Sequence, residues 1–428
     1  MAGSKRVDLE AWEWAIREAV LCAGATVLER MLRELCSGRR DEPVVCGCGS
    51  RMESRGVREK EVTTILGPVR IGRSMFRCPA CGRTRYPGDE ELDVEGTGYS
   101  PGLRRMMARA GSNTTFKEGR EDLQVYAGIT VSAKSIERVS ETIGAEMERW
   151  ARREGESHVE AFAELPERER TIPHLYVSMD GTGVPMTKRE LAGRAGKQPD
   201  GSAKTREVKL GCAFTQTTVD DEGRPVRDPE STSFVGAIES AEPFGERIFA
   251  EAVRRGLALA HEVAVLGDGA AWVRGIAETY FPGAVQIIDL YHAREHVSNL
   301  CKDLFGSDEQ TIALYRAHWW DYLDAGTIET IIAEARAVLP RNRQRRAKAK
   351  AEIGFLENNK ERMRYNKFRA MGFFVGSGVV EAGCKSIIAH RLKQSGMEWS
   401  LRGANAIIAL RCVMKSGRLE DYWEARTA

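Results

Sequence analysis

The sequence lacks a long hydrophobic run, and neither sign of charge is in excess. Its most apolar stretch, residues 257–266, is short and is interrupted by His261 and Glu262, so we expect no membrane span. The first 14 residues carry charges but no apolar core behind them, which argues against a secretory signal. Lysine and arginine number 64 against 62 aspartates and glutamates, a net charge of +2. This balance excludes a uniformly basic, histone-like protein but permits local basic faces.

A framework of disulfides is not expected either. Ten cysteines are present, of which four form two close pairs and six are scattered. Without a secretory signal we expect a reducing cytoplasm, in which cysteines remain thiols or bind metal. With 42% hydrophobic and 29% charged residues the chain can bury a core. Its 428 residues suggest about three domains.

The two cysteine pairs, Cys46 with Cys48 and Cys78 with Cys81, flank a predicted β-hairpin. Between them, two stretches of alternating apolar and polar residues stand on either side of a Gly-Pro turn. Four thiolates from two such turns bind zinc tetrahedrally. We therefore predict a closed structural zinc site. The C-x-C spacing of the first pair is less typical than C-x-x-C, and four unrelated buried cysteines are the alternative.

Two other N-terminal segments have a helical pattern. Residues 7–35 place apolar side chains at helical spacing, which predicts a helix that either packs on its own chain or forms a dimer. Residues 116–126 and 132–143 predict two helices joined by a short glycine-bearing turn, the outline of a helix-turn-helix. Lys134 and Arg138 would then face outward and contact DNA, although any helical hairpin has the same outline.

The C-terminal half contains three consecutive predicted strands followed by alternating helices and strands, the element order of an RNase H-like domain. In that order the first and fourth strands are neighbours, so Asp180 and Asp268, at the ends of these strands, meet at one edge of the sheet. Two adjacent carboxylates repel unless a cation neutralises them. Oxygen ligands suit Mg²⁺ or Mn²⁺, and a pair of such ions can clamp a phosphodiester. Alternatively, each aspartate only caps a strand-to-loop turn.

A third carboxylate is expected from a later helix. Glycines precede the predicted helix, and Glu381 lies in its first turn, where a carboxylate is favoured. Lys385, Arg391 and Lys393 follow and could hold DNA phosphates. The alternative is an ordinary helix-start glutamate with Lys385 as its i,i+4 partner.

A long helical stretch, residues 301–370, precedes that segment. Between Arg336 and Arg369 it has twelve lysines and arginines against three glutamates. This excess, which includes Arg345, Arg346 and Lys348, predicts contact with DNA, although a run of charge can also be a solvated face.

Several motifs together resemble DDE-type transposases of bacterial insertion sequences, in particular the ISKra family and more distantly the Mutator-type enzymes. They are Met179-Asp-Gly-Thr-Gly183, Leu266-Gly-Asp-Gly-Ala-Ala-Trp272, Ile288-Asp-Leu-Tyr-His-Ala-Arg-Glu295 and Gly378-Val-Val-Glu-Ala-Gly-Cys-Lys385. The cysteine region and the sequence Gly396-Met-Glu-Trp-Ser400 are also similar, so the resemblance covers nearly the whole chain from about residue 43. It implies an RNase H-like core with an all-helical insertion, and Asp180, Asp268 and Glu381 as the DDE triad.

The predicted fold class is multidomain α+β: a zinc-ribbon and helix-turn-helix N-terminal region, then an RNase H-like α/β catalytic domain with an all-helical insertion. The predicted boundaries are 1–40 for an N-terminal helix that is a candidate for dimerisation, 41–95 for a zinc-ribbon-like module, 96–150 for a helix-turn-helix-like DNA-binding region, 151–172 for a linker, 173–300 and 371–400 for the catalytic domain, 301–370 for the basic helical insertion and 401–428 for a helical tail.

The function that the resemblance implies is transposition in the bacterial cytoplasm, on the nucleoid when the protein is bound to DNA. A homodimer or larger synaptic assembly would bind the element ends in double-stranded DNA. Asp180, Asp268 and Glu381 would hold two Mg²⁺ or Mn²⁺ ions for hydrolysis at the element end and for attack of the freed 3′-hydroxyl on target DNA. Asp289 and His292, placed like the C/D-x-x-H motif of Mutator-type enzymes, would support the metal carboxylates or orient a phosphate.

Two other functions remain open. His292-Ala-Arg-Glu295-His296 matches the H-x-x-E-H motif of zinc metalloproteases, in which the two histidines bind zinc and the glutamate is the base. This motif leaves the aspartates and the paired cysteines unexplained. An inactive or domesticated DNA-binding regulator would keep the N-terminal modules and would not need three acidic residues.

Overall fold

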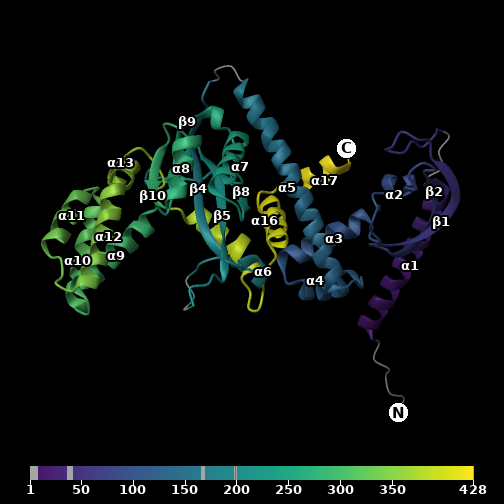
Figure 1. Ribbon diagram of the computed structural model, residues 1–428, viewed down its shortest axis with the longest axis horizontal. Helices are drawn as coiled ribbons and strands as arrows, with labels where there is room; N and C mark the ends of the chain where they lie inside the picture. The colour runs from purple at the N-terminus through teal and green to yellow at the C-terminus, as the bar shows by residue number, and fades with distance from the viewer. Residues whose placement is uncertain (1–7, 36–41, 165–168, 197, 199, 428) are drawn as a thin grey trace, which may run out of the picture. The chain divides into compact units, whose positions relative to one another are not determined.

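The computed structural model describes residues 8–35, 42–164, 169–196, 198 and 200–427 (Figure 1). The chain divides into two compact units, Met1–Ser140 and Glu141–Ala428. Val7, at which the first predicted helix begins, lies outside the described residues, as do residues 36–40 of the first predicted segment and 165–168 of the predicted linker. No helix of the described residues is both long enough and apolar enough to cross a membrane.

The first unit is built on an antiparallel hairpin of β1 (Glu53–Thr64) and β2 (Gly67–Arg77), with the short β3 (Thr84–Arg85) beside β2. Gly67 has φ +125°, a conformation that suits glycine at this tight turn. Apolar side chains of the hairpin pack against α1 (Leu9–Leu35), whose Ala25 is buried in the same cluster.

Short helices follow the hairpin. They are α2 (Pro87–Glu91), α3 (Pro101–Asn113), α4 (Phe116–Asp122), the π-helical turn η1 (Leu123–Ala127) and α5 (Ala133–Ala163). Thr115 and Glu118 form a reciprocal capping box that starts α4. Gly128, with φ +69°, ends η1, and the Ser132 hydroxyl accepts a hydrogen bond from Ser135 N at 3.0 Å as α5 begins. The helix–turn–helix outline is therefore present, but α5 continues to Ala163, so the first part of the predicted linker is helical.

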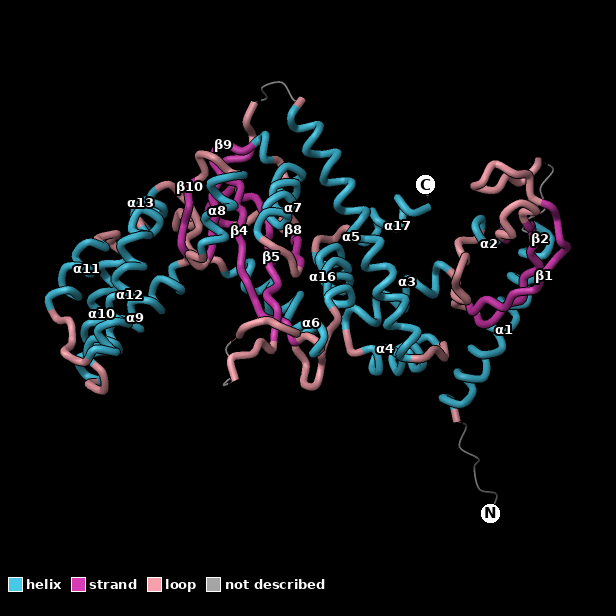
Figure 2. Tube along the Cα trace, viewed as in Figure 1, coloured by secondary structure: helices cyan, strands magenta, loops and turns pink. Residues whose placement is uncertain are grey.

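A mixed five-stranded sheet forms the centre of the second unit, in the order β10-β9-β4-β5-β8 (Figure 2). Strands β9 and β10 run parallel to β4, whereas β5 is antiparallel to both β4 and β8. The strands are β4 (Ile172–Pro185), β5 (Thr205–Gln216), β8 (Ser233–Ala237), β9 (Ala260–Gly267) and β10 (Val285–Ile288). A short α6 (Lys188–Leu191) and a two-stranded ribbon, β6 (Thr218–Val219) with β7 (Pro225–Val226), lie in the connections. The chain thus has the mixed α+β character that its sequence predicts.

Helices cover both faces of this sheet. On one face, α7 (Ala241–Arg254) and α8 (Ala271–Tyr280) pack against alternate residues of β4, including Leu175, Val177 and Met179. The 3₁₀ turn η2 (Leu257–Leu259) leads into β9. On the other face lie α14 (Gly378–Gly383), the π-helical turn η4 (Cys384–Ala389), α15 (His390–Leu392) and α16 (Leu401–Lys415).

The C-terminal segment completes the edge of the sheet. Asn405 Oδ1 accepts a hydrogen bond from Ile238 N at 2.8 Å, and Ser416 Oγ accepts one from Phe234 N at 2.8 Å. Side chains of α16 and its C-cap thereby satisfy donors at β8, an edge strand whose free N–H groups would otherwise be open to another chain. Residues 401–415, predicted as part of a tail, are therefore integral to the sheet domain. The last helix is α17 (Leu419–Thr427).

Helices alone occupy the chain between β10 and α14. They are α9 (Leu290–Phe305), α10 (Glu309–Asp324), α11 (Ile328–Ala337), α12 (Arg343–Asn359), the 3₁₀ turn η3 (Lys360–Met363) and α13 (Tyr365–Ala370). Trp319 is buried in their core and donates a hydrogen bond to Glu334 at 2.7 Å. This helical insertion, shown in green in Figure 1, separates the last strand from the helix that carries Glu381.

Candidate active site and cysteine cluster

Three aspartates lie at the same level of three adjacent parallel strands. The prediction that Asp180 ends its strand is wrong, because β4 pairs with β5 as far as Pro185. Asp180 is in β4, Asp268 directly follows β9 and Asp289 directly follows β10. Ser178 of β4 pairs with Leu266 of β9, so the aspartates two residues further along stand at the same level. Strand β10 pairs with β9 up to the residue before each aspartate. The sheet order alone therefore brings three carboxylates to one edge.

Asp180 and Asp268 are close enough for the charge of Asp268 to affect the pKa of Asp180. Burial raises the pKa of Asp180 above its usual value, and the negative charge of Asp268 adds to this rise. Hydrogen bonds from the Cys384 thiol and from Gly181 N, the latter at 2.7 Å, oppose it. Asp268 accepts a hydrogen bond from Ala270 N at 2.8 Å. A cation between these carboxylates would relieve their repulsion.

Asp289 differs from the other two aspartates because its carboxylate is fully buried and both of its oxygens accept hydrogen bonds. Its Oδ1 accepts hydrogen bonds from His292 N at 2.9 Å and His292 Nδ1 at 3.1 Å, and its Oδ2 accepts one from Ser377 N at 2.5 Å. Burial alone would raise the pKa of Asp289, but these hydrogen bonds lower it. The bond to Asp289 raises the pKa of His292 to about 9, helped by the charges of Asp268 and Glu381. Asp289 thus orients the imidazole and leaves Nε2 for another partner.

Glu381 joins this group from α14, in the first turn of the helix. Its Oε1 accepts a hydrogen bond from Ser377 Oγ at 2.9 Å. The ligand atoms of Asp289, His292 and Glu381 all lie within 4.8 Å of one another. Ser377 therefore connects Asp289 to Glu381 through its backbone N–H and its hydroxyl. Sequence reasoning missed Ser377; its only local signal is its position between two glycines before a helix.

Charge effects connect the five acidic and histidine residues, but only Asp289, His292 and Glu381 form a group whose ligand atoms lie within 4.8 Å of one another; Asp180 and Asp268 are not in that group. Asp268 and His292 both influence Asp180, and Asp268 and Glu381 both influence His292. The chain bends into the π-helical turn η4 directly after α14, a deviation that is frequent at functional sites. Carboxylate oxygens and one imidazole in this arrangement could hold a divalent cation.

Among the predicted DNA contacts near this edge, two lysines are exposed and one arginine is not. The Lys393 ammonium donates a hydrogen bond to Thr182 Oγ1, two residues beyond Asp180, and Lys385 is exposed on η4. Arg391, by contrast, is 0% exposed, with its guanidinium carbon 5.0 Å from the centre of the Trp399 ring. The prediction that Arg391 contacts DNA is therefore corrected, because a buried guanidinium cannot reach a phosphate.

The basic residues of the helical insertion also divide into two kinds. Arg345 Nε and Nη2 donate to the carbonyl oxygens of Asp303 at 3.0 Å and Leu304 at 2.6 Å, near the C-terminal end of α9. Arg345 is half-buried, and these hydrogen bonds hold it against α9; its contact with DNA stays a prediction. Arg346 and Lys348 are exposed.

Helix α5 carries the two candidate contacts of the first unit. Arg138 is exposed, and Lys134, also exposed, pairs with Glu137 at 2.6 Å. Lys134 thus has an acidic partner on its own helix, and an exposed i,i+3 ion pair of this kind is weak.

The metalloprotease motif is not arranged as one site. His292 Nδ1 faces Asp289, whereas His296 Nδ1 lies 2.6 Å from Glu352 and its ring stacks on Phe355 with a centroid distance of 3.6 Å. His296 is not part of any potential metal-binding group among the described residues. The two histidines of the motif therefore have separate partners.

The four paired cysteines of the first unit come together. Their sulfurs lie within 4.8 Å of one another, and Sγ–Sγ distances are 3.5 Å for Cys46–Cys81 and for Cys48–Cys78. Four sulfurs at about 2.3 Å from one zinc ion are separated by about 3.8 Å in a regular tetrahedron. Hydrogen bonds from Ser50 lower the pKa of Cys48 to about 6. A hydrogen bond from Arg83 N–H lowers the pKa of Cys81, but those with Cys46 and Cys78 outweigh it and raise this pKa to about 11, so only Cys48 of the two favours the thiolate. This Cys₄ cluster could bind zinc.

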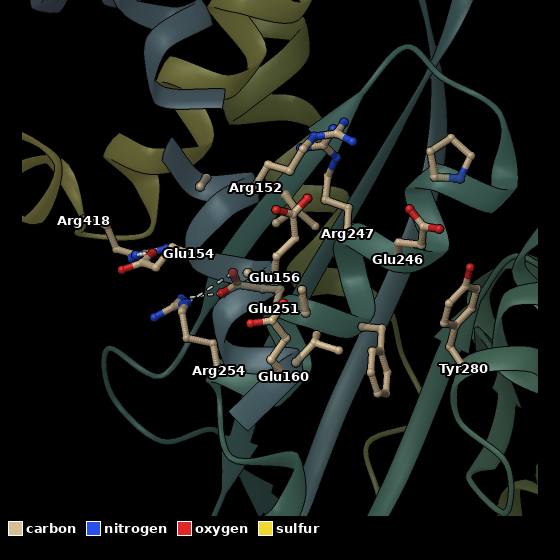
Figure 3. Close-up of a pocket in the computed structure, with 17 residues that line it drawn as sticks. Arg152, Glu154, Glu156, Glu160, Glu246, Arg247, Glu251, Arg254, Tyr280 and Arg418 are labelled. Atoms are coloured by element: carbon tan, nitrogen blue, oxygen red, sulfur yellow. Dashed lines mark hydrogen bonds and ion pairs between the residues drawn. The ribbon is translucent and has the colours of Figure 1, made fainter. Parts of the chain in front are cut away.

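A separate pocket of about 460 Å³ lies in the second unit between α5 and α7 (Figure 3). Several of its charged side chains pair with one another, Arg254 with Glu251 and Arg418 with Glu154. The residues that line the pocket include none of the predicted site residues. This pocket is therefore separate from the candidate active site at the sheet edge.

Comparisons with known proteins found similarity to one protein family, to one protein and to one solved structure. Residues 249–426 match the model of the uncharacterised protein family UPF0236. A protein of Streptococcus gallolyticus, described as the UPF0236 protein in vanSb 3′ region, is 25% identical over 406 residues, covering 93% of this chain and 80% of its own length. The solved Drosophila P element transposase strand transfer complex is similar over 75% of this chain and 79% of its own, at 7% identity and a TM-score of 0.23, too low to define a shared fold. The chain is thus similar to UPF0236 proteins, and the matched segment contains Asp268, Asp289, His292 and Glu381 but not Asp180.

Proposed function

We propose that this chain is a DDE-type transposase that binds the ends of an insertion sequence and cleaves and joins DNA there. One observation carries the proposal: Asp180 and Asp268 stand at the same level of two neighbouring parallel strands, and Glu381 comes from α14, a later helix that packs against β4. Their residue types are those of the DDE triad that the sequence resembles. The ISKra family remains the proposed relationship within these transposases.

The sheet supports an RNase H-like core. In sequence order its strands are β4, β5, β8, β9 and β10, and in space β4 lies in the middle with β5 antiparallel to its neighbours. An RNase H-like core needs this arrangement, since it makes the first and fourth strands adjacent and parallel. The helical insertion between β10 and α14 corresponds to the insertion that the resemblance implies.

Each polar residue at the edge has a proposed role. Two Mg²⁺ ions, held by Asp180, Asp268 and Glu381, would activate the attacking oxygen and stabilise the leaving oxygen of an in-line displacement. Asp289 holds the His292 imidazole, and through Ser377 it also holds Glu381. His292 Nε2 would donate a hydrogen bond to a phosphate oxygen. Four carboxylates and one histidine match the hard-oxygen preference of Mg²⁺ or Mn²⁺ better than that of zinc.

DNA would be held on both units. We propose that the Cys₄ cluster binds structural zinc and that α4 and α5 read the element ends, with Lys134 and Arg138 near the DNA. On the second unit the exposed Lys385, Lys393, Arg346 and Lys348 would contact phosphates of element or target DNA. Backbone contacts of this kind position the duplex without reading its sequence.

The experiment is Mg²⁺-dependent nicking of a labelled duplex that carries the native element ends. Wild type should cleave, Asp180→Ala and Asp268→Ala should bind but not cleave, and Asp321→Asn, an exposed aspartate of α10, should behave as wild type. Binding without cleavage by the wild type in both Mg²⁺ and Mn²⁺ would support the regulator instead. Full cleavage by Asp268→Ala would overturn the assignment of the second carboxylate.

A further inference from the structure

An apolar stripe runs along the outer face of α1. Six large side chains form it, and three of them, Leu9, Ile16 and Val20, are each 64% exposed. The other members are Trp12, Val27 and Met31. Successive steps of seven and four residues, from Leu9 to Ile16, Val20, Val27 and Met31, repeat every eleven residues, close to three helical turns, so these side chains share one face.

The opposite face of α1 already has a partner within the chain. Ala25 is buried against Val62, Val69 and Ile71 of the hairpin, and Leu28 packs against the same cluster. At about 100° per residue, Ala25 lies roughly 160° and Leu28 roughly 100° around the helix from Leu9. The stripe is therefore not the face that folding of the first unit requires, and a contiguous exposed apolar surface of this kind marks an interaction site.

We propose that the stripe binds a second copy of the chain, with the two α1 helices antiparallel and crossing near Val20. The two end members of the stripe, Leu9 and Met31, each lie eleven residues from Val20. Antiparallel pairing places Leu9 of one copy opposite Met31 of the other and closes the assembly at two chains, because the same patch is used by both.

Charge selects the antiparallel orientation. The N-terminal half of the helix is acidic: Asp8, Glu10, Glu13 and Glu18 stand against one arginine, Arg17. The C-terminal half has no excess of either sign, since Arg30 and Arg33 stand against Glu29 and Glu34, and Arg33 pairs with Glu29 at 2.7 Å. Parallel helices would bring eight acidic side chains together, and like charges at such spacing destabilise a helix pair. Antiparallel helices bring Asp8 and Glu10 beside Arg30 of the other copy.

The first test is the mass of the full-length, zinc-loaded chain in solution, by analytical ultracentrifugation over a concentration series. The wild type should be a dimer, and Val20→Asp with Val27→Asp should raise the dimer dissociation constant at least ~100-fold, since two charges per copy would be buried without partners. Leu314→Asp is the matched control, because Leu314 is 69% exposed on a helix of the second unit, and it should leave the dimer unchanged.

Orientation is tested by disulfide formation in a Cys22→Ser background, since Cys22 is exposed on α1. Chains carrying Leu9→Cys should cross-link to chains carrying Met31→Cys, and two chains that both carry Leu9→Cys should not cross-link. Cross-linking of Leu9→Cys with itself would overturn the antiparallel arrangement, and a monomeric wild type or an unaffected Val20→Asp, Val27→Asp dimer would overturn the interface. Circular dichroism and zinc content show that each variant folds. No readout depends on DNA cleavage, so failure here is distinct from failure of the proposed function.

Discussion

Replacing Asp289 by asparagine tests how the sheet edge is held together. The carboxylate is buried and accepts three hydrogen bonds, two from His292 and one from Ser377 N. An amide has one acceptor oxygen, so one of these donors must face the NH₂ group instead. A hydrogen bond to a charged group contributes about 1.5–3 kcal/mol, and a buried donor left without a partner costs about 1–3 kcal/mol. We expect Asp289→Asn to lower the free energy of unfolding by roughly 2–4 kcal/mol.

Thermal unfolding and metal binding measure this effect. At about 2–4 °C per kcal/mol for a unit of this size, the melting temperature should fall by roughly 5–15 °C. Because Ser377 also holds Glu381, Mn²⁺ binding, followed by titration calorimetry, should weaken by about 10–100-fold, as is typical when a residue behind metal ligands is changed.

The matched control is Asp308→Asn. Asp308 is also an N-cap aspartate, since it accepts a hydrogen bond from Thr311 N at 3.1 Å at the start of α10, but it is exposed. Asparagine and aspartate are equivalent caps, so its stability should change by less than about 0.5 kcal/mol. If Asp289→Asn melted and bound Mn²⁺ like Asp308→Asn, the proposed connection from Asp289 through Ser377 to Glu381 would be refuted.

Three further predictions concern other parts of the chain. Cys78→Ser should abolish zinc binding, measured as zinc per chain. It should also make the first unit sensitive to proteolysis while the second stays resistant, since structural zinc supplies about 10–16 kcal/mol to such modules. Equal zinc content in Cys78→Ser and wild type would contradict this prediction. Lys393→Gln should weaken DNA binding and reduce the salt dependence of binding by the equivalent of about one phosphate contact. Arg391→Gln, a change in the core, should instead lower the melting temperature. An unchanged salt dependence for Lys393→Gln would argue against a phosphate contact. The hydrogen bond from Arg364 lowers the pKa of Glu329 to about 2 from an ordinary 4.5. This ion pair therefore stabilises the insertion fully above pH 4.5, and its contribution is lost as the pH falls toward 2. An ordinary pKa for Glu329, measured by NMR titration of the carboxyl groups, would show that the ion pair does not form.

The candidate site was accessible to sequence reasoning to the extent that it depends on strand order. A buried strand with a polar residue at its end has a local pattern, and Asp268 after β9 shows it; Asp180 follows a buried run in the same way but lies inside β4. Which strands are adjacent follows from the element order, since a parallel crossover connection has few allowed topologies. The cysteine pairs and their hairpin are readable for the same reason: the spacing of residues within a turn is a local property.

Contacts between residues far apart in the chain could not be predicted from the sequence. Ser377 and Asp289 are 88 residues apart, and no local pattern shows that one donates to the other. Arg391 and Arg345 look like surface charge in the sequence, yet one stacks on Trp399 in the core and the other binds carbonyl oxygens of a neighbouring helix. The predicted tail likewise proved to supply hydrogen-bond acceptors to the edge strand β8.

Local sequence patterns were thus enough to predict the periodic elements of this protein, the cysteine pairs and the acidic residues that follow buried runs, because apolar spacing and turn chemistry act over a few residues. Tertiary structure alone decided which charges are buried, which hydrogen bonds orient His292 and Glu381, and which face of α1 remains open. Those outcomes depend on the side chains that folding brings together from distant segments, and their energies come from burial and pairing that no single segment contains.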